Sequence, residues 1–438
     1  MTVETTCCVV GGGPAGVMLG YLLAREGIRV TVLEKHNDFF RDFRGDTVHP
    51  STLEVLHELG LLDAFLELPH QRVDSAGGVY GDFEFQGPDF RHVPARCRFI
   101  ALMPQWDFLN FLSEEARKQA TFDLRMHQEV TDLIREGDRI TGVRARGPEG
   151  ESTEFHADLV VGCDGRHSVT RSAGGMELLE IGVPIDVLWF RLSRRADDPE
   201  QVLGQINYGR VLILIDRAEY FQAGLIVPKG SYEDVRAAGL AAFRESIRRI
   251  APFLDGRVDE IQSWDQVKVL TVQLNRLQRW YREGLLCIGD AAHAMSPAGG
   301  VGINLAIQDA VASANILARP LREGRVTEAV LARVQKRREL PTRVTQWVQA
   351  MAHRGFAQVF QNRGPLQAPW QFRAAMQIPG VHVLLGYAVG MGVRPEHVRK
   401  QTGRTPRVVA IAVGFAAGVL AAVAVMQIGG RKRVRSVH

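Results

Sequence analysis

The residues best suited to chemistry stand near the amino terminus, in Gly11-Gly12-Gly13-Pro14-Ala15-Gly16. The segment has the spacing G-x-G-x-x-G and separates a short apolar run from a stretch of helical periodicity. Such glycines permit a tight turn, close approach of a pyrophosphate and close packing of helix on strand. Glu34 ends the next apolar run, where a carboxylate can accept hydrogen bonds from ribose hydroxyls and disfavours a ribose 2′-phosphate. The pattern predicts a dinucleotide site for FAD or NAD, made by Gly11, Gly13, Pro14, Ala15, Gly16, Glu34 and Lys35.

Two later segments also combine an apolar strand with glycine and aspartate. The run from Asp158 to Arg171 contains Asp164-Gly165, and Ser168 is expected to cap the following helix. The run that starts at Gly284 contains Gly289-Asp290; Pro297 and a glycine-rich turn then open another helix.

Together the three segments resemble the fingerprints of the class A flavoprotein monooxygenases, the p-hydroxybenzoate hydroxylase-like family of FAD enzymes. The resemblance covers the chain from about Thr6 to Asn315. It implies non-covalent FAD, with NADPH or NADH and O2 as co-substrates. It also implies hydroxylation of an electron-rich aromatic or related organic substrate through a C4a-hydroperoxyflavin. No second glycine fingerprint is present for a separate NAD(P)H domain.

The resemblance also implies roles for individual residues. Asp290 and Gln105 would contact the ribityl chain, and Arg44 the FAD pyrophosphate. A helix amino terminus would lie beneath the flavin pyrimidine and stabilise negative charge there, through Gly299, Gly300, Gly302, Ile303 and Asn304. The backbone of Pro297 would line the hydroxylation pocket.

Several of these residues have a second interpretation. Asp164 could assist nucleotide binding or only stabilise its turn by Asx hydrogen bonding. Arg44 could be a solvated surface arginine, and Gln105 a simple helix cap. His293 is interpreted as a hydrogen-bonded packing residue rather than a general base.

The elements that position these residues indicate an α/β fold, with a Rossmann-type FAD-binding domain, an inserted β-sheet substrate domain and carboxyl-terminal helices. The pattern assigns 1–75, 98–180 and 275–320 to the FAD-binding domain and 76–97 and 181–274 to the substrate domain. Residues 321–403 are expected to be helical. The first strand is expected from Thr6, and a short helix is expected to be capped by Ser51, with Glu54 reaching back.

Composition sets limits on the class of protein. The 438 residues are 46% hydrophobic and 23% charged, which is typical of a globular chain. The net charge of +4 comes from the carboxyl-terminal tail, so the body gives no support to a nucleic-acid site. Five cysteines and 13 histidines lack the spacing of a disulfide framework or a metal site. The catalytic body is therefore expected to be cytoplasmic, with no metal.

The tail contains an apolar run, Val408–Met426, between basic clusters. Its length predicts a transmembrane helix over about 408–428, and the alternative is a helix packed on the body. Gly414 and Gly418 form G-x-x-x-G, which favours a homodimer within a bilayer. A membrane anchor would suit an alternative function, a FAD-dependent reductase or quinone-ring hydroxylase of an isoprenoid or lipid substrate. A non-catalytic flavin-binding membrane protein is the third possibility.

Overall fold

The computed structural model describes residues 1–40, 47–199 and 202–399. Its first sheet has eight strands, with β1 (Thr2–Val10) at the centre. Parallel partners flank β1: β2 (Val30–Leu33) and β8 (Phe122–Arg125) on one side, β11 (Ser152–Gly162) and β20 (Leu285–Cys287) on the other. Since parallel strands end at one edge, the segments that follow β1, β2, β11 and β20 meet there. The antiparallel members are β9 (Glu129–Glu136), β10 (Arg139–Arg146) and β19 (Tyr281–Arg282).

Three helices cover one face of this sheet. Helix α1 (Pro14–Arg25) packs against α8 (Gly302–Arg322) and α4 (Gln105–Arg117). Their apolar side chains form the largest core, in which Val17, Leu112 and Ile307 are fully buried. This packing brings the amino termini of α1 and α8 to the sheet edge where the glycine-rich segments lie.

The second sheet has seven strands in the order β17-β13-β16-β15-β14-β5-β6. Side chains alternate along β13 (Ile185–Ser193): Leu188 and Phe190 pack against α7 (Leu240–Ile250), whereas Val187 and Trp189 belong to the core on the opposite face. The other strands are β5 (Ser75–Tyr80), β6 (Phe83–Asp89), β14 (Val202–Asn207), β15 (Arg210–Asp216), β16 (Tyr220–Pro228) and β17 (Lys268–Leu270).

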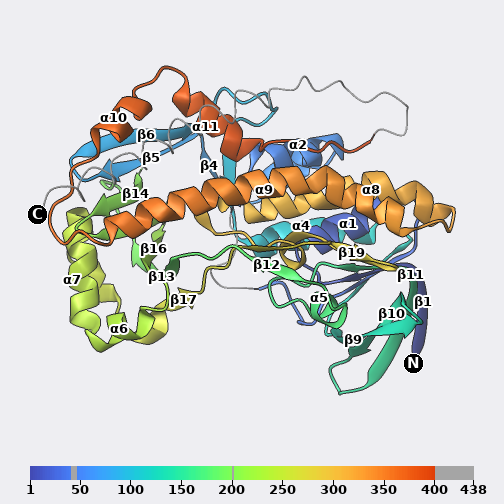
Figure 1. The fold of residues 1–438 in the computed structure, drawn as a ribbon. Helices are drawn as coiled ribbons and strands as arrows, with labels where there is room; N and C mark the ends of the chain where they lie inside the picture. The colour runs from blue at the N-terminus through green and yellow to red at the C-terminus, as the bar shows by residue number, and fades with distance from the viewer. Residues whose placement is uncertain (41–46, 200–201, 400–438) are drawn as a thin grey trace, which may run out of the picture.

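Helix α9 (Glu328–Val359) runs across the molecule and contacts both halves, α8 at one end and β13 and β15 at the other (Figure 1). The remaining elements are shorter. They are β3 (Thr47–Val48), α2 (Pro50–Glu58), α3 (Leu62–Leu66), β4 (Gln71–Val73), β7 (Ile100–Leu102), α5 (Val169–Ala173), β12 (Leu178–Glu180), α6 (Tyr232–Ala237), β18 (Asn275–Leu277), α10 (Trp370–Met376) and α11 (Val381–Gly390), with 3-10 turns at Pro252–Leu254, Val258–Glu260, Trp264–Gln266, Gly289–Ala291 and Ala298–Gly300.

Two local predictions were wrong. The first strand begins at Thr2 rather than Thr6, because the parallel pairing with β11 extends to its start. Ser51 does not cap α2: the helix begins at Pro50, with His49 as the N-cap, and Ser51 is buried inside the first turn. Proline at the first helical position already fixes the required backbone angle, so Ser51 is displaced into the helix.

The predicted transmembrane helix, 408–428, lies outside the described residues. Within the described ranges, a single helical stretch, Ala298–Arg322, is long and apolar enough to cross a membrane. Its most apolar window is 72% buried, so this stretch is a core helix that covers the first sheet.

Candidate functional site

The glycines after β1 have different steric roles. Gly11 has φ +104°, and a Cβ there would lie 2.5 Å from the carbonyl oxygen of Cys163. A Cβ on Gly16 would lie 1.9 Å from the carbonyl oxygen of Gly11. A Cβ on Gly13 would meet no atom of the described residues within 4 Å. Gly11 and Gly16 are therefore required by the fold, whereas Gly13 leaves open space beside the helix.

That space lies at an uncapped helix amino terminus. Gly13 is the N-cap of α1, Pro14 and Ala15 begin its first turn, and no side chain among the described residues caps it. Such a terminus presents backbone N–H groups and the positive end of the helix dipole, which suits a phosphate. Glu34 lies beside it: its Oε2 accepts from Gly12 N at 2.9 Å, and its Oε1 accepts from His36 N. The neighbouring Lys35 is exposed.

Asp164 follows β11, and its side chain points toward the start of helix α5. Its carboxylate accepts hydrogen bonds from the hydroxyls of Ser168 (2.6 Å) and Thr170 (2.8 Å) and from Thr170 N (2.9 Å). Ser168 caps α5 as predicted, accepting from Arg171 N. These bonds show that Asp164 stabilises its turn.

Asp290 follows β20 and lies beside the segment that contains Asp164 and Arg166. Its Oδ2 accepts from Arg166 Nε at 3.2 Å, and both side chains are about one-third exposed. The buried Arg171 reinforces this junction, donating to the carbonyl oxygens of Ala291 (3.0 Å) and Arg166 (2.6 Å). The segments around Asp164 and Asp290 therefore form one unit.

Gly289 is the point where three segments meet. It has φ +58°, and a Cβ there would lie 3.2 Å from the Cβ of Ala15 and 3.5 Å from that of Ala306. The amino-terminal parts of α1 and α8 therefore both approach this residue. Its N–H donates to Asp309 Oδ2 at 3.1 Å, which ties it to α8.

His293 is a packing residue, as predicted. It is 1% exposed, and its Nε2 lies 2.5 Å from Asp309 Oδ2. Arg338 of α9 donates to the other oxygen of Asp309 at 2.8 Å. Burial acts to raise the pKa of Asp309, but His293 and Arg338 together lower it below its usual value.

The turn before α8 is shaped by glycine. Gly299 and Gly300 have φ +80° and +63°, and a Cβ on Gly300 would lie 2.4 Å from Thr47 Oγ1. Asn304, buried, fixes the turn: its Oδ1 accepts from His49 N (2.9 Å) and Thr52 Oγ1, and its Nδ2 donates to the Thr47 and Gly300 carbonyls. Gly302 and Ile303 begin α8, again with no side-chain cap. Pro297 precedes the turn and is half-buried.

Two predicted cofactor residues have different outcomes. Gln105 is the first residue of α4 and half-buried; the N-cap is Pro104, so the helix-cap interpretation of Gln105 is wrong. Arg44 lies outside the described residues.

Comparison with known proteins agrees with this geometry. A family model described as an FAD binding domain matches residues 4–348. The 6-methylpretetramide 4-monooxygenase of Streptomyces rimosus is 33% identical over 377 residues, which cover 86% of this chain and 89% of that protein. A rifampicin monooxygenase of Streptomyces venezuelae is 27% identical over 313 residues, 69% of this chain and 61% of that protein.

The chain belongs to this family of FAD-dependent monooxygenases. Its fold also matches the solved structure of OxyS anhydrotetracycline hydroxylase from Streptomyces rimosus, with a TM-score of 0.68 and 22% identity, covering 92% of this chain and 78% of that one. The monooxygenase therefore has the mixed α/β architecture predicted for class A aromatic hydroxylases.

The structure of this monooxygenase adds residues that the sequence did not single out. Arg166, Arg171 and Asp309 hold the fingerprints together. The sequence could have indicated the two arginines, because both lie within the segment from Asp158 to Arg171 that contains Asp164-Gly165. Asp309 lies seven residues after Gly302, on the α8 face that meets Gly289, so helical periodicity could have placed it there.

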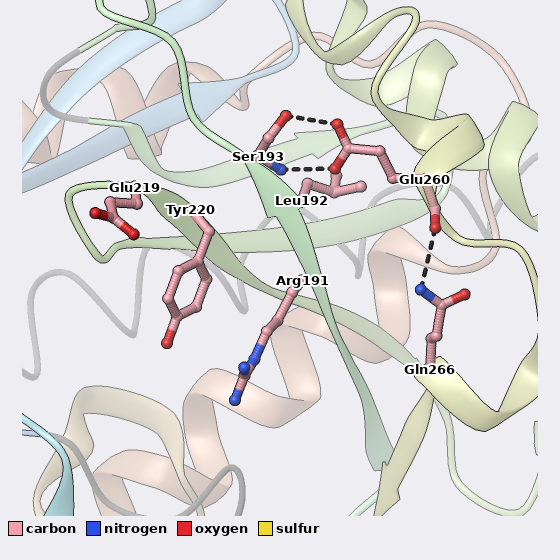
Figure 2. A pocket seen from close by; sticks show the side chains of 7 residues that line it. All are labelled: Arg191, Leu192, Ser193, Glu219, Tyr220, Glu260 and Gln266. Atoms are coloured by element: carbon pink, nitrogen blue, oxygen red, sulfur yellow. Dashed lines mark hydrogen bonds between the residues drawn. The ribbon is translucent and has the colours of Figure 1, made fainter.

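A surface hollow of about 380 Å³ opens at the end of the second sheet, lined by Arg191, Leu192, Ser193, Glu219, Tyr220, Glu260 and Gln266 (Figure 2). The Arg191 guanidinium lies 5.1 Å from the centroid of the Tyr220 ring. Glu260 accepts from the N–H and the hydroxyl of Ser193. None of the predicted cofactor residues that the structure describes lines the hollow, so it is separate from the glycine-rich turns.

Proposed function

We propose that this monooxygenase binds FAD non-covalently where its three fingerprints meet, and hydroxylates a phenolic, multi-ring aromatic substrate with NADPH or NADH and O2. The observation that carries the proposal is the meeting of Ala15, Gly289 and Ala306, which brings two uncapped helix amino termini to one place. The open space at Gly13 fits a pyrophosphate, which supports FAD as the ligand.

Each element then has a distinct task. The turn before α1 and the start of that helix, with Gly11, Gly13, Pro14, Ala15 and Gly16, would bind the pyrophosphate, and Glu34 with Lys35 would lie at the ribose. Asp290, held by Arg166, would accept hydrogen bonds from the ribityl hydroxyls, and Gln105 of α4 would be a second contact. Arg44 and Asp164 remain candidates for nucleotide contact.

The start of α8 would stabilise negative charge on the cofactor. Gly299, Gly300, Gly302, Ile303 and Asn304 form a turn with a free helix end, so backbone N–H groups and the helix dipole act there without a mobile side chain. Bound flavin supplies the oxidising chemistry in such enzymes; the protein orients substrate and excludes water.

The substrate class is inferred from two observations. The two relatives described above are named for 6-methylpretetramide and rifampicin, and the first shares 33% of aligned residues. The α9-facing side of the second sheet is apolar and aromatic: Trp189 lies against Gly224, in the same buried core as Val187 and Ile226. Apolar and aromatic residues line most pockets for small organic molecules, so a sheet with this composition suits the wall of a site for an aromatic molecule.

The test is a substrate screen with purified protein. Phenols, quinone precursors and aromatic polyketides would be assayed for stimulated NADPH and NADH oxidation, with mass spectrometry of the product. We expect stimulation by a phenolic polyketide and a product heavier by one oxygen atom. Turnover under anaerobic conditions would instead support the reductase alternative, and oxidation that no substrate stimulates would support the non-catalytic one.

We further propose that the apolar run 408–428 anchors the enzyme to a membrane with its catalytic body in the cytoplasm. The proposal rests on the composition and length of that run alone.

A further inference from the structure

Helix α9 presents a row of polar side chains to the segment between residues 275 and 309. Gln335, Arg338, Gln346, Gln349 and His353 follow the helical repeat, so they lie on one face. Gln335 accepts from Trp280 N and donates to the Gln278 carbonyl, and Gln346 donates to the carbonyls of Asn275 and Ala294. A buried helix face is usually apolar, so this row needs an explanation.

Gln349 makes the densest set of contacts in the row. Its Oε1 accepts from Ser296 N at 3.1 Å, and its Nε2 donates to the carbonyl oxygens of Ser296 and Ala298, both at 2.9 Å. The side chain is 4% exposed. These atoms belong to the residues immediately before and after Pro297, so one amide group holds the backbone on both sides of that proline.

His353, one turn further along α9, holds the same loop through a hydroxyl. Its Nε2 lies 2.9 Å from Ser296 Oγ, and that oxygen also accepts from Ala298 N at 3.2 Å. Burial lowers the pKa of His353 to about 4, so the ring is neutral near pH 7. Its Nε2 then accepts from the hydroxyl or donates to it according to the tautomer, and either bond ties Ser296 to α9.

We propose that Gln349 and His353 are positioning residues. They hold the Pro297 peptide in the position that oxygen transfer to the substrate requires. The inference rests on the proposed function, in which the Pro297 backbone lines the hydroxylation pocket. Neither side chain needs to touch the substrate or the cofactor. Both act through the fixed position of residues 296–298, between the packed Met295 and the start of the Gly299 turn.

The expected consequence of losing this support is uncoupling. In the coupled reaction, NADPH, a proton, O2 and the aromatic substrate give NADP+, the hydroxylated product and water. When the substrate is misplaced, NADPH, a proton and O2 give NADP+ and hydrogen peroxide instead. Both reactions transfer two electrons from NADPH, so the split between product and peroxide measures positioning rather than reduction of the cofactor.

The test compares Gln349→Leu with Gln346→Leu. Both remove a buried glutamine of similar exposure (4% and 1%) from the same helix, but only Gln349 contacts residues on both sides of Pro297. Hydrogen exchange of the FAD-free protein is measured first, on peptides covering 292–302. We expect Gln349→Leu to speed amide exchange at Ser296 and Ala298 by about tenfold, and Gln346→Leu to leave these amides near wild type.

Coupling is then measured in the FAD-loaded enzyme. We expect product per NADPH to fall about tenfold in Gln349→Leu and less than about twofold in Gln346→Leu, with similar melting temperatures for the two variants. Ser296→Ala, which removes the hydroxyl contact to His353 but keeps the backbone contacts to Gln349, should give an intermediate loss. The visible circular dichroism of bound flavin reports the same loop without turnover.

Two results would overturn the proposal: equal exchange in the two glutamine variants, or faster exchange in Gln349→Leu with coupling unchanged. If the exchange result holds but wild-type enzyme hydroxylates no aromatic compound, the proposed function has failed and the support of the loop by α9 stands. If Gln349→Leu does not fold, Ser296→Ala and His353→Asn carry the same comparison.

Discussion

Arg166 Nε donates to Asp290 Oδ2 at 3.2 Å, and this bond joins two segments that lie 124 residues apart. The bond places the carboxylate at the carboxyl edge of the parallel sheet, near the first turns of α1 and α8. A carboxylate fixed in this way is ready to accept from a bound hydroxyl without reorganising.

Asp290→Ala should therefore weaken FAD binding. Loss of a charge-assisted hydrogen bond costs about 1.5–3 kcal/mol, so the FAD dissociation constant should rise at least about tenfold. Quenching of flavin fluorescence on titration of the FAD-free protein measures it. Arg166→Ala is the control and should weaken binding less, because it only loosens the carboxylate. Unchanged affinity in Asp290→Ala would contradict the ribityl assignment.

Gly13→Ala and Gly16→Ala should separate cofactor binding from folding. The Cβ at position 16 would meet the Gly11 carbonyl oxygen at 1.9 Å, so Gly16→Ala should fail to fold. The Cβ at position 13 meets no atom within 4 Å in the part of the chain that the structure describes, so Gly13→Ala should cost less than about 1 kcal/mol of folding free energy. It should nevertheless lose FAD, because its methyl group occupies the space assigned to the pyrophosphate. Full flavin content in Gly13→Ala would place the pyrophosphate elsewhere.

Asp309→Asn should destabilise the protein by about 3 kcal/mol or more, because it leaves the buried Arg338 cation poorly compensated. Urea unfolding measures the change. Asp123→Asn is the matched control: Asp123 also pairs with an arginine, Arg125, but both side chains are exposed, so less than about 1 kcal/mol is expected. Similar losses of unfolding free energy in the two variants would mean that the buried Asp309 pair stabilises the fold no more than an exposed pair does.

Stability should depend on pH through His397 and Glu58. The hydrogen bond from His397 Nδ1 to Glu58 Oε1 (2.5 Å) raises the pKa of His397 in the folded chain. A raised folded pKa means that the pair stabilises the fold fully below the unfolded value of 6.5, and that this contribution is lost as pH rises through the folded pKa. The gain should be at most about 1 kcal/mol, since the pair is partly solvated.

Melting temperatures between pH 6 and pH 9 would measure that dependence. The decline between these values should be smaller in His397→Gln and in Glu58→Gln than in wild type. An identical decline in all three proteins would assign it to other groups.

The segment before the tail should be needed for the fold, and the tail only for the membrane. Glu396 accepts from Arg337 (2.6 Å) and Arg338 (3.4 Å), so a chain ending at Gly392 would leave Arg338 without this partner and should lose FAD.

A chain ending at Gly403 should keep FAD and leave the membrane fraction, whereas the full chain should resist carbonate washing. Full-length protein that needs no detergent would exclude the anchor; Gly414→Leu with Gly418→Leu tests the dimer separately.

The sequence alone was enough to predict the cofactor class, because glycine turns and the strands before them depend on local backbone conformation. G-x-G-x-x-G, Asp164-Gly165 and Gly289-Asp290 each identify a strand end by themselves, and parallel pairing then requires them to meet at one edge. Burial of His293 was likewise predictable from its position inside a packed motif.

Only the tertiary structure decided which polar groups support that edge. Arg166 with Asp290, Asp309 with Arg338, and Gln349 with the Pro297 loop join residues from 29 to 124 positions apart. No local pattern encodes such pairs, since any buried arginine or glutamine needs a partner and many are available along the chain. For Arg338 and Gln349 the choice is made by helix packing, which sets α9 across both halves of the molecule and thereby fixes which groups these side chains can reach.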